Sequence, residues 1–96
     1  MDVEDQLLAK GLNAPRLSPA LIEDTVIKSN FHRLTDVLTV CVLTLRNGFT
    51  VTGESACASP ENYNKEIGEQ IARTNAVEKI WVLEGYLLKQ RLFESK

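Results

Sequence analysis

Two β-type segments joined by Asn47 and Gly48 dominate this sequence. Residues 37–46 read VLTVCVLTLR and residues 49–57 read FTVTGESAC, and both are rich in β-branched and apolar side chains. Asn-Gly tolerates the positive φ angles of a two-residue type I′ turn, whose twist matches that of the flanking strands. The sequence therefore predicts an antiparallel β-hairpin over about residues 37–57.

The turn fixes which side chains share a face, because a two-residue loop makes Arg46 the partner of Phe49. The same register pairs Thr44 with Val51, Val42 with Gly53 and Cys41 with Glu54. One face then carries Val40, Val42, Thr44, Phe49 and Val51, and the other carries Cys41, Leu43, Leu45, Thr50, Thr52 and Glu54. A ribbon that is apolar on both sides must be covered twice. We therefore expect either an extended sheet or an oligomer formed through helices.

Helical patterns flank the hairpin on both sides. Ser18 and Pro19 form a hydroxyl cap followed by a proline at the first helical position, which predicts a helix that ends near Ser29 or Asn30. A shorter amphipathic helix is predicted in residues 1–11. With the hairpin, these helices define an α+β fold.

A long helix is predicted after the hairpin, from residue 59 to about residue 93. Its apolar stripe widens past Asn75, so we expect that half to be largely buried. Gly85 costs about 1 kcal/mol relative to alanine in a helix interior, and it marks a kink, a break or a close helix contact. The predicted anchors of the core or of an interface are Phe49, Ile80, Trp81, Tyr86 and Leu87.

Size and composition predict one small domain that associates with itself. The chain has 96 residues, of which 44% are hydrophobic, so its stability margin is narrow unless partner subunits add buried surface. Residues 18–94 are the expected folded core, and residues 1–17 are an arm that is flexible or depends on a partner. We expect a homo-oligomer.

Charge argues against nucleic acid as a partner. Eleven basic and thirteen acidic side chains give a net charge of −2, without the basic surface that binds phosphates. The last helix has the composition of the final helix of a double-stranded RNA-binding domain, but its Lys65 stands among acidic residues. RNA binding is therefore a minor alternative.

Cysteine content and the first residues indicate a reduced, cytoplasmic compartment. Two cysteines are too few for a disulfide scaffold or a structural zinc site, and we expect neither metal nor cofactor. Residues 1–11 carry acids where a signal peptide needs a basic region, and no apolar run is long enough to span a membrane.

No enzyme motif is present, and the protein is expected not to be an enzyme. The only histidine, His32, could serve as a base for Cys41 or Cys57, but both thiols lie in apolar or small-residue surroundings typical of buried structural cysteines. Glu54 has two interpretations that remain open: a buried carboxylate with a partner, or a solvated residue on an exposed edge. His32 and Arg33 could bind an anionic group, which Arg46 could join only across a subunit boundary or by a fold-back.

The strings NGFTVTGESA, IARTNA and W..EGYLL occur together and in order, and through them the chain resembles a family of small tailed-bacteriophage accessory and early proteins. The resemblance covers about residues 31–92 and includes the aromatic-histidine pair Phe31-His32. It implies a viral protein that acts inside a bacterial host, and it supplies no catalytic residues.

Three functions follow as hypotheses. The first is a non-enzymatic protein that binds and inhibits a host defence or regulatory protein in the host cytoplasm. The second is a sponge for a nucleotide immune signal at a subunit interface. Its candidate binding residues are His32, Arg33, Arg46, Glu54, Ser55, Tyr63 and Asn64. The third is a cryptic enzyme that uses Glu54, His32 or a cysteine.

Overall fold

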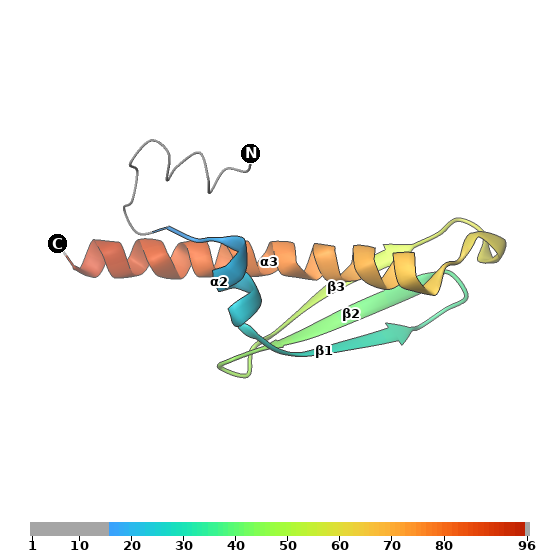
Figure 1. Cartoon of the computed structure of the whole chain (residues 1–96), viewed down its shortest axis with the longest axis horizontal. Coiled ribbons are helices and arrows are strands. Elements are labelled where there is room, and N and C mark those ends of the chain that lie inside the picture. Colours follow the sequence, from blue (N-terminus) through green and yellow to red (C-terminus); the bar gives the residue numbers. More distant parts are fainter. Residues whose placement is uncertain (1–15, 96) are drawn as a thin grey trace.

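The computed structural model describes residues 16–95, which form a three-stranded sheet with one long helix across it. The elements are α2 (Pro19–Asp24), β1 (Val26–Arg33), β2 (Leu38–Leu45), β3 (Thr50–Ala56), a 3₁₀ turn (Pro60–Asn62) and α3 (Lys65–Glu94). The sheet is antiparallel in the order β1-β2-β3, and α3 lies along one of its faces (Figure 1). The α+β fold is confirmed, whereas the helix predicted in residues 1–11 lies outside the described residues.

The helix predicted from Ser18 to Asn30 was wrong in its second half, which is strand β1. The start is as expected, because the Ser18 hydroxyl accepts a hydrogen bond from the Leu21 amide and Pro19 follows. The helix stops after Asp24, where the Thr25 hydroxyl donates to the Ile22 carbonyl. The β-branched residues that follow pair with β2 instead, so tertiary pairing outweighs the weak helical pattern. Strand β1 adds a third strand to the hairpin, so of the two expected covers, an extended sheet or an oligomer, the structure shows the extended sheet.

The hairpin is confirmed, but its register is shifted by one residue from the predicted one. Its loop has three residues, since the Leu45 amide donates to the Phe49 carbonyl and only Gly48 has a positive φ, of 88°. The observed pairs are Thr44–Thr50, Leu43–Val51, Val42–Thr52, Cys41–Gly53 and Val40–Glu54. Every β3 side chain therefore lies on the opposite face from the predicted one. The result is one apolar face and one mixed face, not two apolar faces.

A close approach between two backbones holds α3 on the sheet. A Cβ atom at Gly53 would lie 2.2 Å from both the Ala72 carbonyl oxygen and the Ala76 amide nitrogen. Because β3 has glycine there and α3 has alanines, the helix packs almost directly on the strand. The buried core around this contact consists of Ile22, Cys41, Leu43, Leu45, Val51, Ala72, Ala76 and Ile80.

Helix α3 begins later than predicted and is continuous through Gly85. Ser59 and Pro60 start only the 3₁₀ turn, and the side chain of Asn64 caps α3 by accepting a hydrogen bond from the Ile67 amide. Neither a break in the helix nor a close helix contact is found at Gly85, because α3 runs unbroken through it and a Cβ there would meet only the Leu17 side chain, at the ordinary distance of 3.9 Å.

The second half of α3 is less buried than predicted. Ile80 is a core residue, as expected. The other four residues predicted as anchors of the core or of an interface, Phe49, Trp81, Tyr86 and Leu87, are exposed in the single chain, so they are not core residues, and their place in an interface stays a prediction. The helix continues past the sheet (Figure 1), and in the described chain the side chain of Leu17 lies near it there, at Gly85.

Replacing Gly53 should strongly destabilise the fold. The alanine methyl in Gly53→Ala collides with backbone atoms of α3, so we expect a loss of about 2–3 kcal/mol or more in the free energy of unfolding. Gly85→Ala is the matched control, because its methyl meets only Leu17 at an ordinary distance and adds about 1 kcal/mol of helix propensity. Urea unfolding measures both. Equal stability of the two variants would show that α3 does not rest on β3 as described.

The ion pair between Glu23 of α2 and Arg73 of α3 should make stability depend on pH. The two side chains meet through two hydrogen bonds of 2.9 and 2.7 Å, and the hydrogen bonds from Arg73 lower the pKa of the Glu23 carboxyl below its ordinary value of 4.5. Glu23 is about half exposed, so after solvent screening the pair is worth about 0.5 kcal/mol. This contribution is present above pH 4.5 and is lost as the pH falls through the lowered pKa.

Unfolding of Glu23→Gln, compared with the parent chain, tests this pair. The variant should be less stable at pH 7, and the difference should shrink as the pH falls below 4.5 and through the lowered pKa of the parent carboxyl. A difference in stability that does not change with pH would contradict an ionic contribution.

Candidate functional site

The sheet face opposite α3 is open, with Leu38 and Ala56 at one end of it and three rows of side chains that span all three strands. The register sets His32, Val40 and Glu54 in one row. The next two rows are Asn30, Val42 and Thr52, and then Lys28, Thr44 and Thr50. The two valines in the centre are half-buried, and no element in residues 16–95 covers this face. It has an apolar centre with a polar border, and we call it the open face.

Charge is distributed unequally across the open face. Lys28 and His32 lie on β1 at one border, and Glu54 lies on β3 at the other. Neighbouring strands are about 4.8 Å apart, so His32 and Glu54 are separated by about 10 Å and by the Val40 side chain. Glu54 is exposed, which settles its two interpretations in favour of a solvated residue on a sheet edge. Its carbonyl accepts a hydrogen bond of 2.8 Å from the Asn75 side chain of α3.

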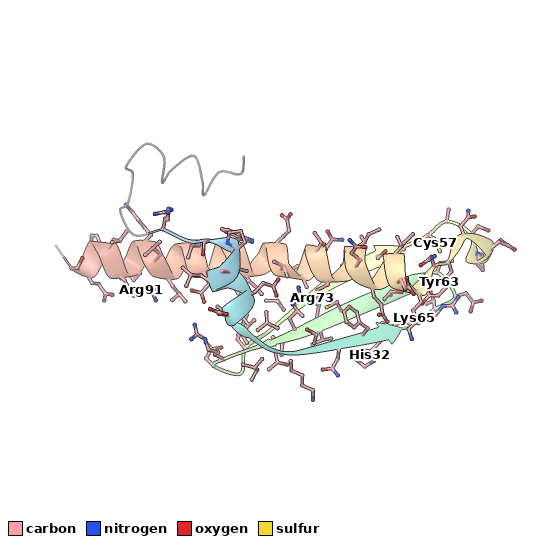
Figure 2. The ribbon with its side chains drawn as sticks, in the orientation of Figure 1. His32, Cys57, Tyr63, Lys65, Arg73 and Arg91 are labelled. Atoms are coloured by element: carbon pink, nitrogen blue, oxygen red, sulfur yellow. The ribbon has the colours of Figure 1, made fainter. Side chains whose placement is uncertain are left out.

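Four other predicted residues gather where α3 begins. The guanidinium of Arg33 lies 3.6 Å from the centre of the Tyr63 ring, and it donates to the Asp36 carbonyl at 2.6 Å. Ser55, Tyr63 and Asn64 line a small cavity of about 140 Å³ beside them. His32 and Tyr63 lie at this same end of the molecule (Figure 2). Arg33 is nevertheless on the helix side of the sheet, because it pairs with the buried Thr39.

Arg46 is far from this end. It lies on the hairpin loop, beside a separate groove of about 590 Å³ between the loop and α3. The structure thus divides the seven predicted binding residues among the open face, the small cavity with its stacked Arg33, and the loop. They do not form one pocket.

The proposed thiol and base pair is not formed. Cys41 is fully buried on the sheet face that α3 covers. His32, on the adjacent strand β1, lies on the opposite, open face. Burial raises the pKa of the Cys41 thiol. Cys57 is half-buried just past β3, with its thiol 3.8 Å from the Val37 carbonyl oxygen.

Alkylation rates should separate the two cysteines. Iodoacetamide should modify Cys57 in the native protein, while Cys41 reacts only on unfolding because it is buried and its pKa is raised. Mass spectrometry of timed samples, with Cys57→Ala as the control, follows each thiol. Native labelling of both cysteines at similar rates would contradict the buried position of Cys41.

Sequence reasoning missed most of the open face. Lys28 and Asn30 were placed in a helix, and Thr52 was placed on the wrong side of the hairpin. The missed signal was the run of β-branched residues Thr25, Val26 and Ile27, which ends a helix and favours a strand.

Fold and surfaces together define a small α+β protein with one helix-covered sheet face and one open face. A family model for phage proteins, described as the N4 Gp49/phage Sf6 gene 66 family, matches residues 17–92. The chain belongs to this family, which confirms the predicted phage-protein resemblance. Searches of curated proteins and of solved structures found no match.

Two further findings concern the described part of the chain. None of its helices is long and apolar enough to cross a membrane. Within residues 16–95, no three His, Cys, Asp or Glu side chains are grouped so that they could hold a metal ion.

Proposed function

We propose that this phage protein is a non-enzymatic binding protein that inhibits a host defence or regulatory protein in the host cytoplasm. The open face is its binding surface. The observation that carries the proposal is that a complete sheet face, with half-buried valines at its centre, has no cover within the described chain.

The composition of the open face supports this proposal. Protein-binding surfaces typically combine an apolar centre, which loses its water on binding, with a polar border that sets orientation. Val40 and Val42 form such a centre, and the hydroxyls of Thr44 and Thr52 stand beside them. Strand residues are held rigidly by the ladder hydrogen bonds, so little conformational entropy is lost when a partner binds.

The charges indicate the chemistry of the partner. Lys28 favours an acidic side chain along β1, and Glu54 favours a basic group beside β3. We therefore propose a host protein whose contact surface has an apolar strip with an acidic border. Family membership supports the host cell as the place of action.

The messenger-sponge alternative has less support. It needs the basic and polar candidates to line one pocket, and Arg33, Arg46 and Glu54 lie in three different places. The small cavity near Tyr63, at about 140 Å³, is well below the roughly 300–1,000 Å³ of typical ligand pockets.

A substitution at the centre of the open face tests the proposal. The full chain captures its host partner from lysate, mass spectrometry identifies it, and the purified partner is then titrated by calorimetry. Val42→Glu should weaken binding at least about tenfold, because it buries an unpaired charge in the interface. Thr74→Glu introduces the same group on an exposed position of α3 and should bind normally.

The partner's own activity decides whether binding inhibits it. Activity should fall as the parent protein is added and should be unaffected by Val42→Glu. A captured protein that binds Val42→Glu as tightly as the parent would exclude the open face. The absence of any host protein that binds directly would overturn the function.

A further inference from the structure

Helix α3 is longer than the sheet that it covers. Thirty residues of α-helix span about 45 Å, whereas strands of seven or eight residues span about 25 Å. The last buried residue of the helix is Ile80. Residues 81–94 extend past the hairpin loop (Figure 1), and we call them the overhang.

The sheet-facing side of α3 stays apolar in the overhang. Ala76 and Ile80 contact the core, and Leu83 and Leu87 continue the same line at helical spacing. These leucines are nevertheless 36% and 45% exposed, because the sheet ends before it reaches them. They form an apolar seam without a cover in the described chain.

The seam forms one wall of a groove. Its volume is about 590 Å³, and the hairpin loop forms the other wall. The residues that give it its apolar character are Leu45, Phe49, Val82, Leu83, Tyr86 and Leu87. A groove of this volume accepts several large side chains.

Side chains border the seam on both sides, and we call these two borders its flanks. Each flank has a pair of residues that are two helical turns apart. Glu84 and Arg91 are seven residues apart on one flank, and Tyr86 and Phe93 are seven residues apart on the other. Tyr86 is 71% exposed and Phe93 is 67% exposed. Within residues 16–95 neither Glu84 nor Arg91 makes an ion pair.

We propose that the overhang pairs antiparallel with the overhang of a second copy of this chain. In an antiparallel pair of identical helices, each flank faces the same flank of its partner. One twofold axis then sets Glu84 against the partner's Arg91 and Tyr86 against the partner's Phe93, and each pair forms twice. Opposite charges meet on one side of the seam, and aromatic rings meet on the other.

The same register fills the groove. The partner's residues 91–94 form the last turn of its α3, and in this register they lie opposite residues 83–86. That turn enters the space between the overhang and the hairpin loop. The groove and the segment that fills it belong to the same chain, which is the self-complementarity that a twofold dimer requires.

The exposed aromatic side chains supply about half of the area that a standard dimer interface buries. An aromatic side chain buries about 150–250 Å², so the exposed fractions of Phe49, Tyr86 and Phe93 amount to about 400 Å². A standard interface buries about 800 Å² per partner. The leucines of the seam and the charged flank contribute to the other half. Such an interface would also leave the open face free.

Charge reversal on the flank tests both the dimer and its register. Light scattering after size exclusion at about 50 µM should give the eluted full-length protein a mass of twice the 10.7 kDa of one chain. Glu84→Arg and Arg91→Glu each place like charges together, and each should raise the dimer dissociation constant about tenfold or more. The double variant restores opposite charges and should recover the parent dissociation constant.

The matched control is Glu78→Arg, which makes the same change on the far side of the same helix and should leave the dimer intact. Circular dichroism confirms that each variant is folded. A parent chain that is monomeric would overturn the proposal, whether the groove is then filled by residues 1–15 or by a host protein. A double variant as weak as the single variants would overturn the antiparallel register.

Discussion

The contact between Gly53 of β3 and Ala72 and Ala76 of α3 determines the rest of this structure. No side chain separates the two backbones there, so the helix lies closer to the sheet than the usual packing of larger residues allows. Gly68 repeats the pattern one turn earlier, where a Cβ would come within 3.3 Å of the Thr39 hydroxyl. Small residues on one line of the helix thus fix its height above the strands and its direction across them.

The direction of the helix in turn decides which surfaces remain uncovered. Because α3 is anchored on β3 and β2, its second half passes the hairpin loop and leaves the sheet. The side chains that would have continued the core then face an apolar groove. On the other side of the sheet, the same anchoring leaves the open face without a helix. Both candidate interaction surfaces are therefore consequences of one close contact.

Local sequence signals predicted the elements better than their pairing. Asn47-Gly48 located the hairpin, and Ser18-Pro19 located a helix start, because both signals act within a few residues. The loop length was missed, since Asn47 does not take the positive φ of a type I′ turn: its side chain accepts a hydrogen bond from the Phe49 amide instead. A difference of one loop residue moved Val51 and Gly53 into the core and Glu54 out of it.

The candidate sites were harder to predict because they depend on long-range geometry. His32 and Glu54 share the open face only through the pairing of β1 with β2, and a helical reading of residues 26–30 removes that pairing. The exposure of Tyr86 and Leu87 depends on where the sheet ends beneath α3, which no pattern within the helix records. An apolar helix therefore indicated that something covers it, without indicating whether the cover is the chain itself or a second copy.

The two proposed surfaces reinforce each other physically. The overhang is at one end of the long axis, and His32 marks the opposite end (Figure 2). A twofold dimer through the overhangs would place its two open faces far apart, each on a rigid sheet. Against a host target that is itself oligomeric, two faces on one particle raise the effective concentration of the second contact, so weak contacts of modest area are sufficient for tight binding. The mild charge and limited apolar area of the open face suit that mode of binding better than a single tight contact.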